Sequence, residues 1–178
     1  VLGGTGNTFT LGDAAQSVNT GAGGTNTIDF VALTATGTIT TQSTDVIKIG
    51  NGADIKGVDG EGNGAGAAFT ATNVTLVNDA SVTMTAAQHN GFATDGFTAN
   101  ATEQITLTTT GTVTGNAAIE TYVLGGNSNT FTLGDAAQNV NTGSGGTNTI
   151  DFAALTATGT ITTQSTDVIK IDDGADIK

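Results

Sequence analysis

The chain contains no proline, cysteine, tryptophan or arginine, and these absences limit the folds and the functions that are possible for it. Without cysteine it has neither disulfide bonds nor a thiol nucleophile. Without proline, every strand can donate its full ladder of hydrogen bonds, as internal strands must. Sixteen acidic residues against four basic ones give a net charge of -12, which repels nucleic acids and anionic lipid. From this charge we expect no nucleic-acid partner. No apolar run approaches the roughly 20 residues of a transmembrane helix, so we also expect no membrane span.

What the chain does contain is a long internal repeat. Residues 1–56 return as residues 123–178 without a gap, and only seven positions differ. The differing pairs are Thr5/Asn127, Gly6/Ser128, Ser17/Asn139, Ala22/Ser144, Val31/Ala153, Gly50/Asp172 and Asn51/Asp173. We interpret residues 1–122 as one complete repeat unit and residues 123–178 as the first part of a second copy. We expect both to belong to a longer array in which each unit packs on its neighbour.

Short segments that alternate apolar and polar residues recur along the chain, as expected of strands with one buried face. Their spacing is regular, because Phe9, Ile28 and Ile47 lie 19 residues apart, as do the polar residues two positions before them. An antiparallel sandwich would not produce this offset. The pattern predicts an all-β fold, a β-roll-like parallel β-solenoid with about 19 residues and two short strands per coil. Phe9, Ile28 and Ile47 should then stack in the interior.

Other segments fit the period less well. A second apolar set, Val18, Ile39 and Ile55, falls midway between the first at less even spacing. Residues 57–68 form a glycine-rich insertion, and residues 86–102 are irregular and could contain a short helical turn. At a rise of about 4.8 Å per coil, a 122-residue unit should comprise about six coils and be roughly 30 Å long.

The sequence offers little material for catalysis. His89 is the only histidine, and we expect it at the surface of the irregular segment. Sugar-stacking aromatics are scarce, so we expect no enzymatic activity. Threonine pairs such as Thr8 and Thr10 suggest an ice-binding face. One coil further on, however, the pair becomes Thr27 and Asp29, so an unbroken threonine array does not form and ice binding is the weakest alternative.

Calcium is the cofactor that the sequence favours most. Asp59, Glu61 and Asn63 in the segment DGEGNG resemble the opening of an oxygen-ligand calcium loop, in which alternate residues face one centre. The twelfth position is Thr70 rather than an acid, which excludes an EF-hand. A solvated turn is the alternative interpretation of this loop.

A second acidic cluster arises where the two copies differ. Asp172, Asp173 and Asp176 form it in the segment DDGAD, whereas the first copy has GNGAD. The cluster is a weaker calcium candidate. The alternative is a charged edge that prevents lateral aggregation.

Several stretches resemble known repetitive proteins. GGTGNTFTL is similar to the glycine-rich nonapeptide of RTX (repeat-in-toxin) β-rolls, and VTMTAAQHNGF and IETYVLGG are similar to stretches of giant bacterial surface proteins of the adhesin and S-layer type. The resemblance implies an exported, surface-attached or released structural protein that calcium often stabilises. Thr8 stands where the RTX pattern requires aspartate, and this departure argues against a regular calcium ladder.

Together these features predict a non-catalytic structural repeat of an extracellular or cell-surface bacterial fibre, stalk or surface layer. We expect it to associate with adjacent repeats or copies of itself. The alternative is an adhesin module whose segments 57–68 and 86–102 bind a cell-surface glycan or a partner cell.

Overall fold

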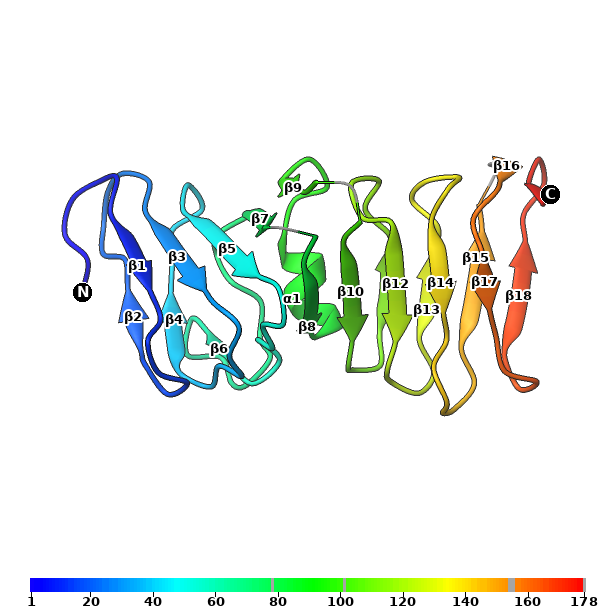
Figure 1. Cartoon of the computed structure of the whole chain (residues 1–178), viewed down its shortest axis with the longest axis horizontal. Helices are drawn as coiled ribbons and strands as arrows, with labels where there is room; N and C mark the ends of the chain where they lie inside the picture. The colour runs from blue at the N-terminus through cyan, green and yellow to red at the C-terminus, as the bar shows by residue number, and fades with distance from the viewer. Residues whose placement is uncertain (78, 101, 154–155, 178) are drawn as a thin grey trace.

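The computed structural model describes residues 1–77, 79–100, 102–153 and 156–177. The chain forms an elongated parallel β-solenoid of about nine turns, with its two termini at opposite ends (Figure 1). This confirms the fold class predicted from the 19-residue period. Each coil has three sides, which the chain visits in a constant order.

The first side is a parallel sheet made of β1 (Thr8–Thr10), β3 (Thr27–Phe30), β5 (Val46–Gly50), β7 (Asn73–Val77) and β9 (Phe97–Thr98). In its register Phe9 pairs with Ile28, Ile28 with Ile47, and Ile47 with Val74. The predicted stack of Phe9, Ile28 and Ile47 is therefore confirmed. Because alternate side chains of a strand point to opposite faces, this register buries one continuous apolar column.

The second side begins with β2 (Val18–Asn19), β4 (Thr38–Thr40) and β6 (Asp59–Gly60) and continues through α1 (Ala86–Gly91) to the sheet of β11 (Thr112–Thr114), β13 (Thr130–Thr132), β15 (Thr149–Phe152) and β18 (Val168–Ile171). Val18 pairs with Ile39, as the second apolar set predicts. The third member was assigned wrongly, because Ile39 pairs with Gly60 and not with Ile55. Ile55 instead donates its backbone N–H to Thr83 on the third side.

The third side starts with single bridges from Thr34 to Asp54 and from Asp54 to Thr83. It continues as a parallel sheet made of β8 (Ser81–Met84), β10 (Gln104–Leu107), β12 (Thr121–Leu124), β14 (Asn139–Asn141) and β17 (Ile161–Thr162). Two further short strands, β16 (Thr156–Ala157) and β19 (Asp176–Ile177), pair with each other.

Buried polar residues close the corners of the coils at the same 19-residue spacing. The Asn26 side chain accepts a hydrogen bond from the backbone N–H of Asn7, and the Asp45 carboxylate accepts one from the backbone N–H of Asn26 at 2.7 Å. Asp45 is fully buried and also accepts from Thr20 Oγ1 and from the backbone N–H of Gln42. These bonds satisfy backbone donors that the turns leave unpaired, so the ladder fixes one coil on the next.

Candidate functional site

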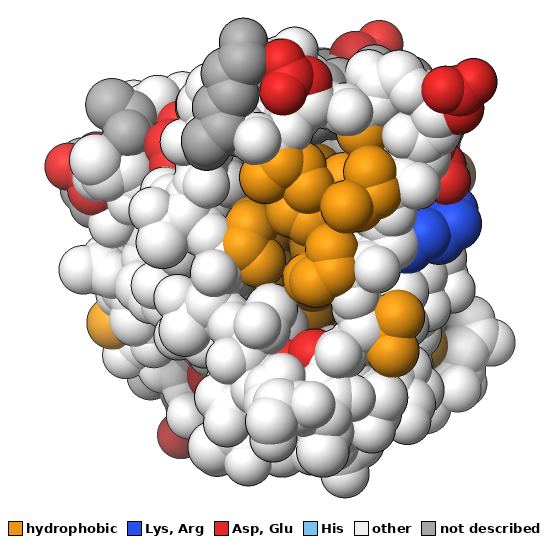
Figure 2. All heavy atoms as spheres, turned by 90° about the vertical axis from the view of Figure 1, so that its right-hand side faces the viewer, with side chains coloured by type: hydrophobic (Ala, Val, Ile, Leu, Met, Phe, Trp, Pro, Cys, Tyr) orange, Lys and Arg blue, Asp and Glu red, His pale blue; other side chains and the backbone are white. Residues whose placement is uncertain are grey.

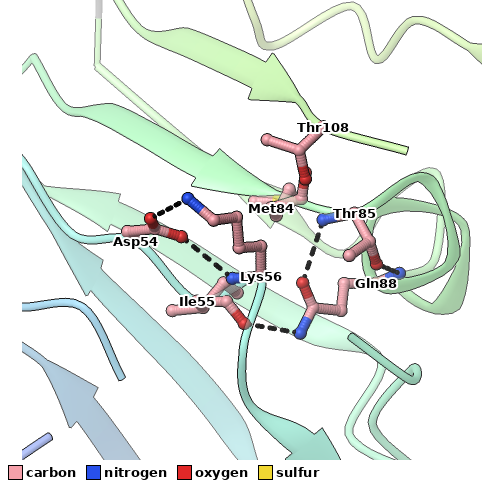
Figure 3. A network of polar contacts seen from close by, with 7 residues as sticks. All are labelled: Asp54, Ile55, Lys56, Met84, Thr85, Gln88 and Thr108. Carbon is pink, nitrogen blue, oxygen red and sulfur yellow. Dashed lines mark hydrogen bonds and ion pairs between the residues drawn. The ribbon is translucent and has the colours of Figure 1, made fainter. Parts of the chain in front are cut away.

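The irregular segment 86–102 contains α1, which takes the place of a strand on the second side (Figure 1). Thr85 and Gln88 form a capping box, because Thr85 Oγ1 accepts from the Gln88 N–H and Gln88 Oε1 accepts from the Thr85 N–H, each at 3.0 Å. The Gln88 amide also donates to the carbonyl oxygens of Ile55 and Val58 in the preceding coil, and Figure 3 shows the bond to Ile55. The helix is thus tied at its first turn to the coil below.

His89 of α1 is buried, so the expectation of a surface histidine is wrong. Its Nε2 lies 3.0 Å from the hydroxyl oxygen of buried Tyr122, which also accepts a hydrogen bond from the Asn116 N–H at 2.8 Å. Burial lowers the pKa of His89 to about 4, against a smaller opposing effect of the Asn90 side chain. Burial likewise raises the pKa of Tyr122. At neutral pH this hydrogen bond therefore joins an uncharged imidazole to a protonated tyrosine hydroxyl.

Ring contacts around His89 continue the hydrophobic core through residues 57–122, which separate the two repeated stretches 1–56 and 123–178. They run in sequence through Phe30, Phe69, Phe92, Phe97, His89, Tyr122 and Phe131, with ring centroids 4.7 to 6.3 Å apart. Large rings fill the interior where α1 replaces a strand. The two copies thus share one core.

A cavity of about 290 Å³ opens beside α1. Its lining residues are His89, Asn90, Phe92, Thr94, Phe97, Thr112, Thr114, Gly115 and Asn116. None of them is ionised at neutral pH, since His89 is the only titratable member. Both imidazole nitrogens already have partners, in Tyr122 and Asn90. The cavity therefore offers hydroxyl and amide groups above phenylalanine rings, which suits a small uncharged polar molecule rather than acid–base chemistry.

The predicted calcium loop lies at β6 and the turn that follows it. Asp59 Oδ1 accepts from the Gly64 N–H at 2.8 Å, and Glu61 Oε1 accepts from the Thr41 N–H, Thr41 Oγ1 and the Thr70 N–H at 2.7 to 3.0 Å. Glu61 holds a positive φ of 63°, and Gly62, Gly64 and Gly66 of the same turn also have a positive φ, which is why this turn is glycine-rich. The Glu61 carboxylate thus joins two coils, while Asn63 is exposed on the turn.

The second acidic cluster lies at the C-terminal end. Asp172 forms an ion pair with Lys170, with Oδ1 3.0 Å from Nζ, and Asp173 and Asp176 are exposed nearby. Among the described residues, no three His, Cys, Asp or Glu side chains converge as a metal centre would require. Calcium binding at either cluster stays a prediction.

Figure 2 shows an apolar patch at the centre of the C-terminal end, with acidic side chains and a basic one near its rim. Ile169, Ile171 and Ile177 are 42%, 58% and 49% exposed there. A hollow of about 340 Å³ lies among Ile169, Ile177, Phe152, Gly159, Ile161 and Thr163. We call this surface the end face. In the first copy, the equivalents of the three isoleucines, Ile47, Ile49 and Ile55, are 0% exposed.

Strand edges are open at the end face as well. β17, β18 and β19 each stand last in their sheets. In the first copy, β5 pairs on both edges and β4 is followed by β6. The edges of β17 and β18 with which no described strand pairs lie next to exposed isoleucines and form a template for a further coil.

Comparison of the chain with protein-family models, with curated proteins and with solved structures finds no match. The resemblance to RTX β-rolls and to bacterial surface proteins thus remains a prediction. Within the described residues, no helix has the length and apolar character needed to cross a bilayer.

Proposed function

We propose that this protein is a non-catalytic structural repeat that builds a rod, as a fibre, stalk or surface layer, by stacking coils end to end. The observation that carries the proposal is the end face. The proposed occupant of this face is a segment equivalent to residues 57–122, because β6, β7 and β8 of that segment cover the same residues in the first copy.

The physical chemistry favours association at this face. Fully burying an isoleucine side chain contributes about 1.5 to 3 kcal/mol, so covering three that are about half exposed contributes on the order of 1 kcal/mol each. Pairing the open edges adds backbone hydrogen bonds with the geometry already present between β5 and β7. Lys170 and Asp172 at the rim provide charge that disfavours other registers.

An extracellular or cell-surface location in a bacterium belongs to the same proposal. Support for it comes from the resemblance to giant repetitive surface proteins and from the strongly acidic composition. The net charge of -12 keeps rods apart laterally through like-charge repulsion, while the end face provides an apolar contact (Figure 2).

Sedimentation velocity over a range of concentrations tests the stacking directly. The chain should self-associate as its concentration rises, and Ile169→Lys with Ile171→Lys should remain monomeric, because a lysine cannot be buried unpaired. Val31→Lys is the matched control, since Val31 is exposed but directly follows β3, away from the end face. A monomeric wild-type chain at all concentrations, or equal association of all three proteins, would overturn the proposal.

The cavity beside α1 favours a second candidate function, recognition of a small neutral carbohydrate by an adhesin module. Its volume and uncharged hydroxyl and amide lining match a single sugar ring. Glycan-array screening followed by titration of the hits with Thr114→Val measures this. Loss of one hydrogen bond should weaken binding about tenfold. Thr132→Val is the control, because Thr132 is the register neighbour of Thr114 and lies outside the cavity. Absence of saturable binding to any glycan would remove this candidate.

A further inference from the structure

Equivalent strands of the two copies do not lie on the same side of the solenoid. In the first copy, β1, β3 and β5 form the first side, and β2 and β4 belong to the second. Their equivalents 122 residues later are β13, β15 and β18, which belong to the second side, and β14 and β17, which belong to the third. Every element of the second copy has moved on by one side.

One column of paired residues makes the displacement explicit. On the third side the bridges and registers join Thr34, Asp54, Thr83, Thr106, Val123, Asn141 and Thr162 in that order. Asn141 and Thr162 are the equivalents of Asn19 and Thr40. In the first copy, Asn19 and Thr40 pair with each other in the sheet on the second side. Two copies stacked in phase would instead place Asn141 above Asn19 on one side.

The remaining strands complete a cyclic shift. β16 follows β15 on the second side and precedes β17 on the third. Since the chain visits each side once per coil, β16 and its partner β19 occupy the first side. Their equivalents in the first copy, around Thr34 and Asp54, occupy the third side. The three sides have thus exchanged places in rotation.

The shift by one side arises in residues 57–122, which separate the repeated stretches 1–56 and 123–178. From Ile47 to Val74 and from Val74 to Phe97 the coils take 27 and 23 residues, whereas Phe9, Ile28 and Ile47 are separated by 19. Counting from β1, the first side is revisited by β3, β5, β7, β9 and the loop 116–119, which is five coils. Each coil runs from the first side to the third and then to the second, as β7, β8 and α1 do. The chain continues to β12 on the third side and β13 on the second, which adds two thirds of a coil. A unit is therefore five and two-thirds coils, where the sequence predicts about six.

We propose that each repeat unit of the array is held in one angular setting only, turned by one side relative to the unit before it. The inference rests on the proposed end-to-end stacking. The edges of β18 and β17 that no described strand pairs with are the equivalents of the edges of β5 and β4 that β7 and β6 continue in the first copy. The incoming strands equivalent to β7 and β6 thus pair on the second and third sides.

This turn sets the repeat of the whole rod. A unit of five and two-thirds coils advances about 27 Å, and three units return the same side after 17 coils, or about 82 Å. Surface features that occur once per unit, such as α1 with its cavity and the turn at Glu61, then appear on the three sides in succession. A lateral partner that reads one side would find its site every third unit.

A tandem protein of six 122-residue units tests this by cryo-electron microscopy, with Asn90→Cys in every unit labelled by a gold cluster. Rods whose labels rotate by a third of a turn per unit, and whose image transforms show a layer line at about 82 Å, are expected from a rise of about 4.8 Å per coil. Rods with all labels on one side and a repeat of about 27 Å would overturn the angular inference while keeping the stacking. The absence of rods would instead contradict the proposed function.

A matched variant duplicates residues 27–45, one complete 19-residue coil, in every unit. It leaves the side-to-side shift unchanged and lengthens each unit by one coil, so the layer line should move from about 82 to about 96 Å. An unmoved layer line would show that the spacing does not arise from the coil count, and would equally overturn the inference.

Discussion

Ile47 and Ile169 occupy the same position in two copies of one sequence, yet Ile47 is fully buried and Ile169 is 42% exposed. The strands around them, β5 and β18, share the residues VIKI. They differ in what covers them. β7 pairs with one edge of β5, whereas no described strand pairs with the corresponding edge of β18. The comparison teaches that burial in a solenoid is supplied by the next coil and not by the local sequence.

The largest expected effect is on the free energy of unfolding when the two isoleucines are truncated. Ile47→Ala should cost about 2 to 5 kcal/mol, because it leaves a cavity in a closed core. Ile169→Ala should cost about 1 kcal/mol or less, because its side chain is partly in water already. Urea denaturation followed by circular dichroism measures both. Similar losses in the two variants would contradict the comparison.

Measuring the free energy of unfolding against pH sharpens the comparison, because it reports on residues 57–122, which contain the only histidine, His89. Burial lowers the pKa of His89 to about 4, so the unfolded chain binds a proton between pH 6.5 and 4 that the folded chain does not. The contribution of His89 to the free energy of unfolding, about 3 kcal/mol, is therefore fully present above pH 6.5 and is lost as the pH falls towards 4.

Urea midpoints between pH 7 and pH 4 should fall more for the wild-type chain than for His89→Gln. His89→Gln removes no other titratable group, so the difference between the two proteins reports His89 alone. Parallel pH profiles for both proteins would mean that the histidine is not buried as described.

The corner carboxylates give a smaller contrast. Asp45 and Asp167 accept the same set of hydrogen bonds, from an asparagine N–H, a threonine hydroxyl and a glutamine N–H. Asp45→Asn should cost about 1 to 3 kcal/mol, because the bonds are fully buried. Asp167→Asn should cost less, because Asp167 is only half-buried. Thermal melts of the two variants side by side decide this, and a greater loss at Asp167 would refute the explanation by burial.

Calcium should produce the smallest effect. If Asp59 and Glu61 bind the ion, millimolar calcium should add about 1 kcal/mol and raise the melting temperature by about 2 to 4 °C, and magnesium should do so less. Asp59→Asn with Glu61→Gln should abolish the rise. Asp172→Asn with Asp173→Asn, which changes only the second copy, should retain most of it. A melting temperature that neither calcium nor a chelator moves would remove calcium from the account.

The 19-residue period was sufficient to predict the solenoid and the stack of Phe9, Ile28 and Ile47, because strand pairing in a coil follows directly from spacing. The position of Ile55 was predicted wrongly, because the period does not reveal that the coil has a third side. A signal for α1 was present in the sequence, since Thr85 and Gln88 have the spacing of a capping box.

Other features were beyond sequence reasoning. Burial of His89 depends on Tyr122, 33 residues away, and on the break in the strand pattern where α1 is inserted. The shift by one side between the copies depends on the lengths of coils that share no repeat, in residues 57–122. Whether Asp59 and Glu61 would face one ion could not be decided from their spacing, because the Glu61 carboxylate is held by Thr41 of the neighbouring coil.

Hydrogen exchange measured by mass spectrometry tests most directly whether the coil that covers β5 but not β18 explains the difference between the copies. Peptides that contain Gly50 and Asn51 or Asp172 and Asp173 distinguish β5 from β18. In the chain of 178 residues, amides of β18 should exchange at least about a hundredfold faster than those of β5. When the chain is extended by a further copy of residues 57–122, β18 should slow to the rate of β5. Exchange in β18 that already equals that of β5, or that the extension leaves unchanged, would contradict the account.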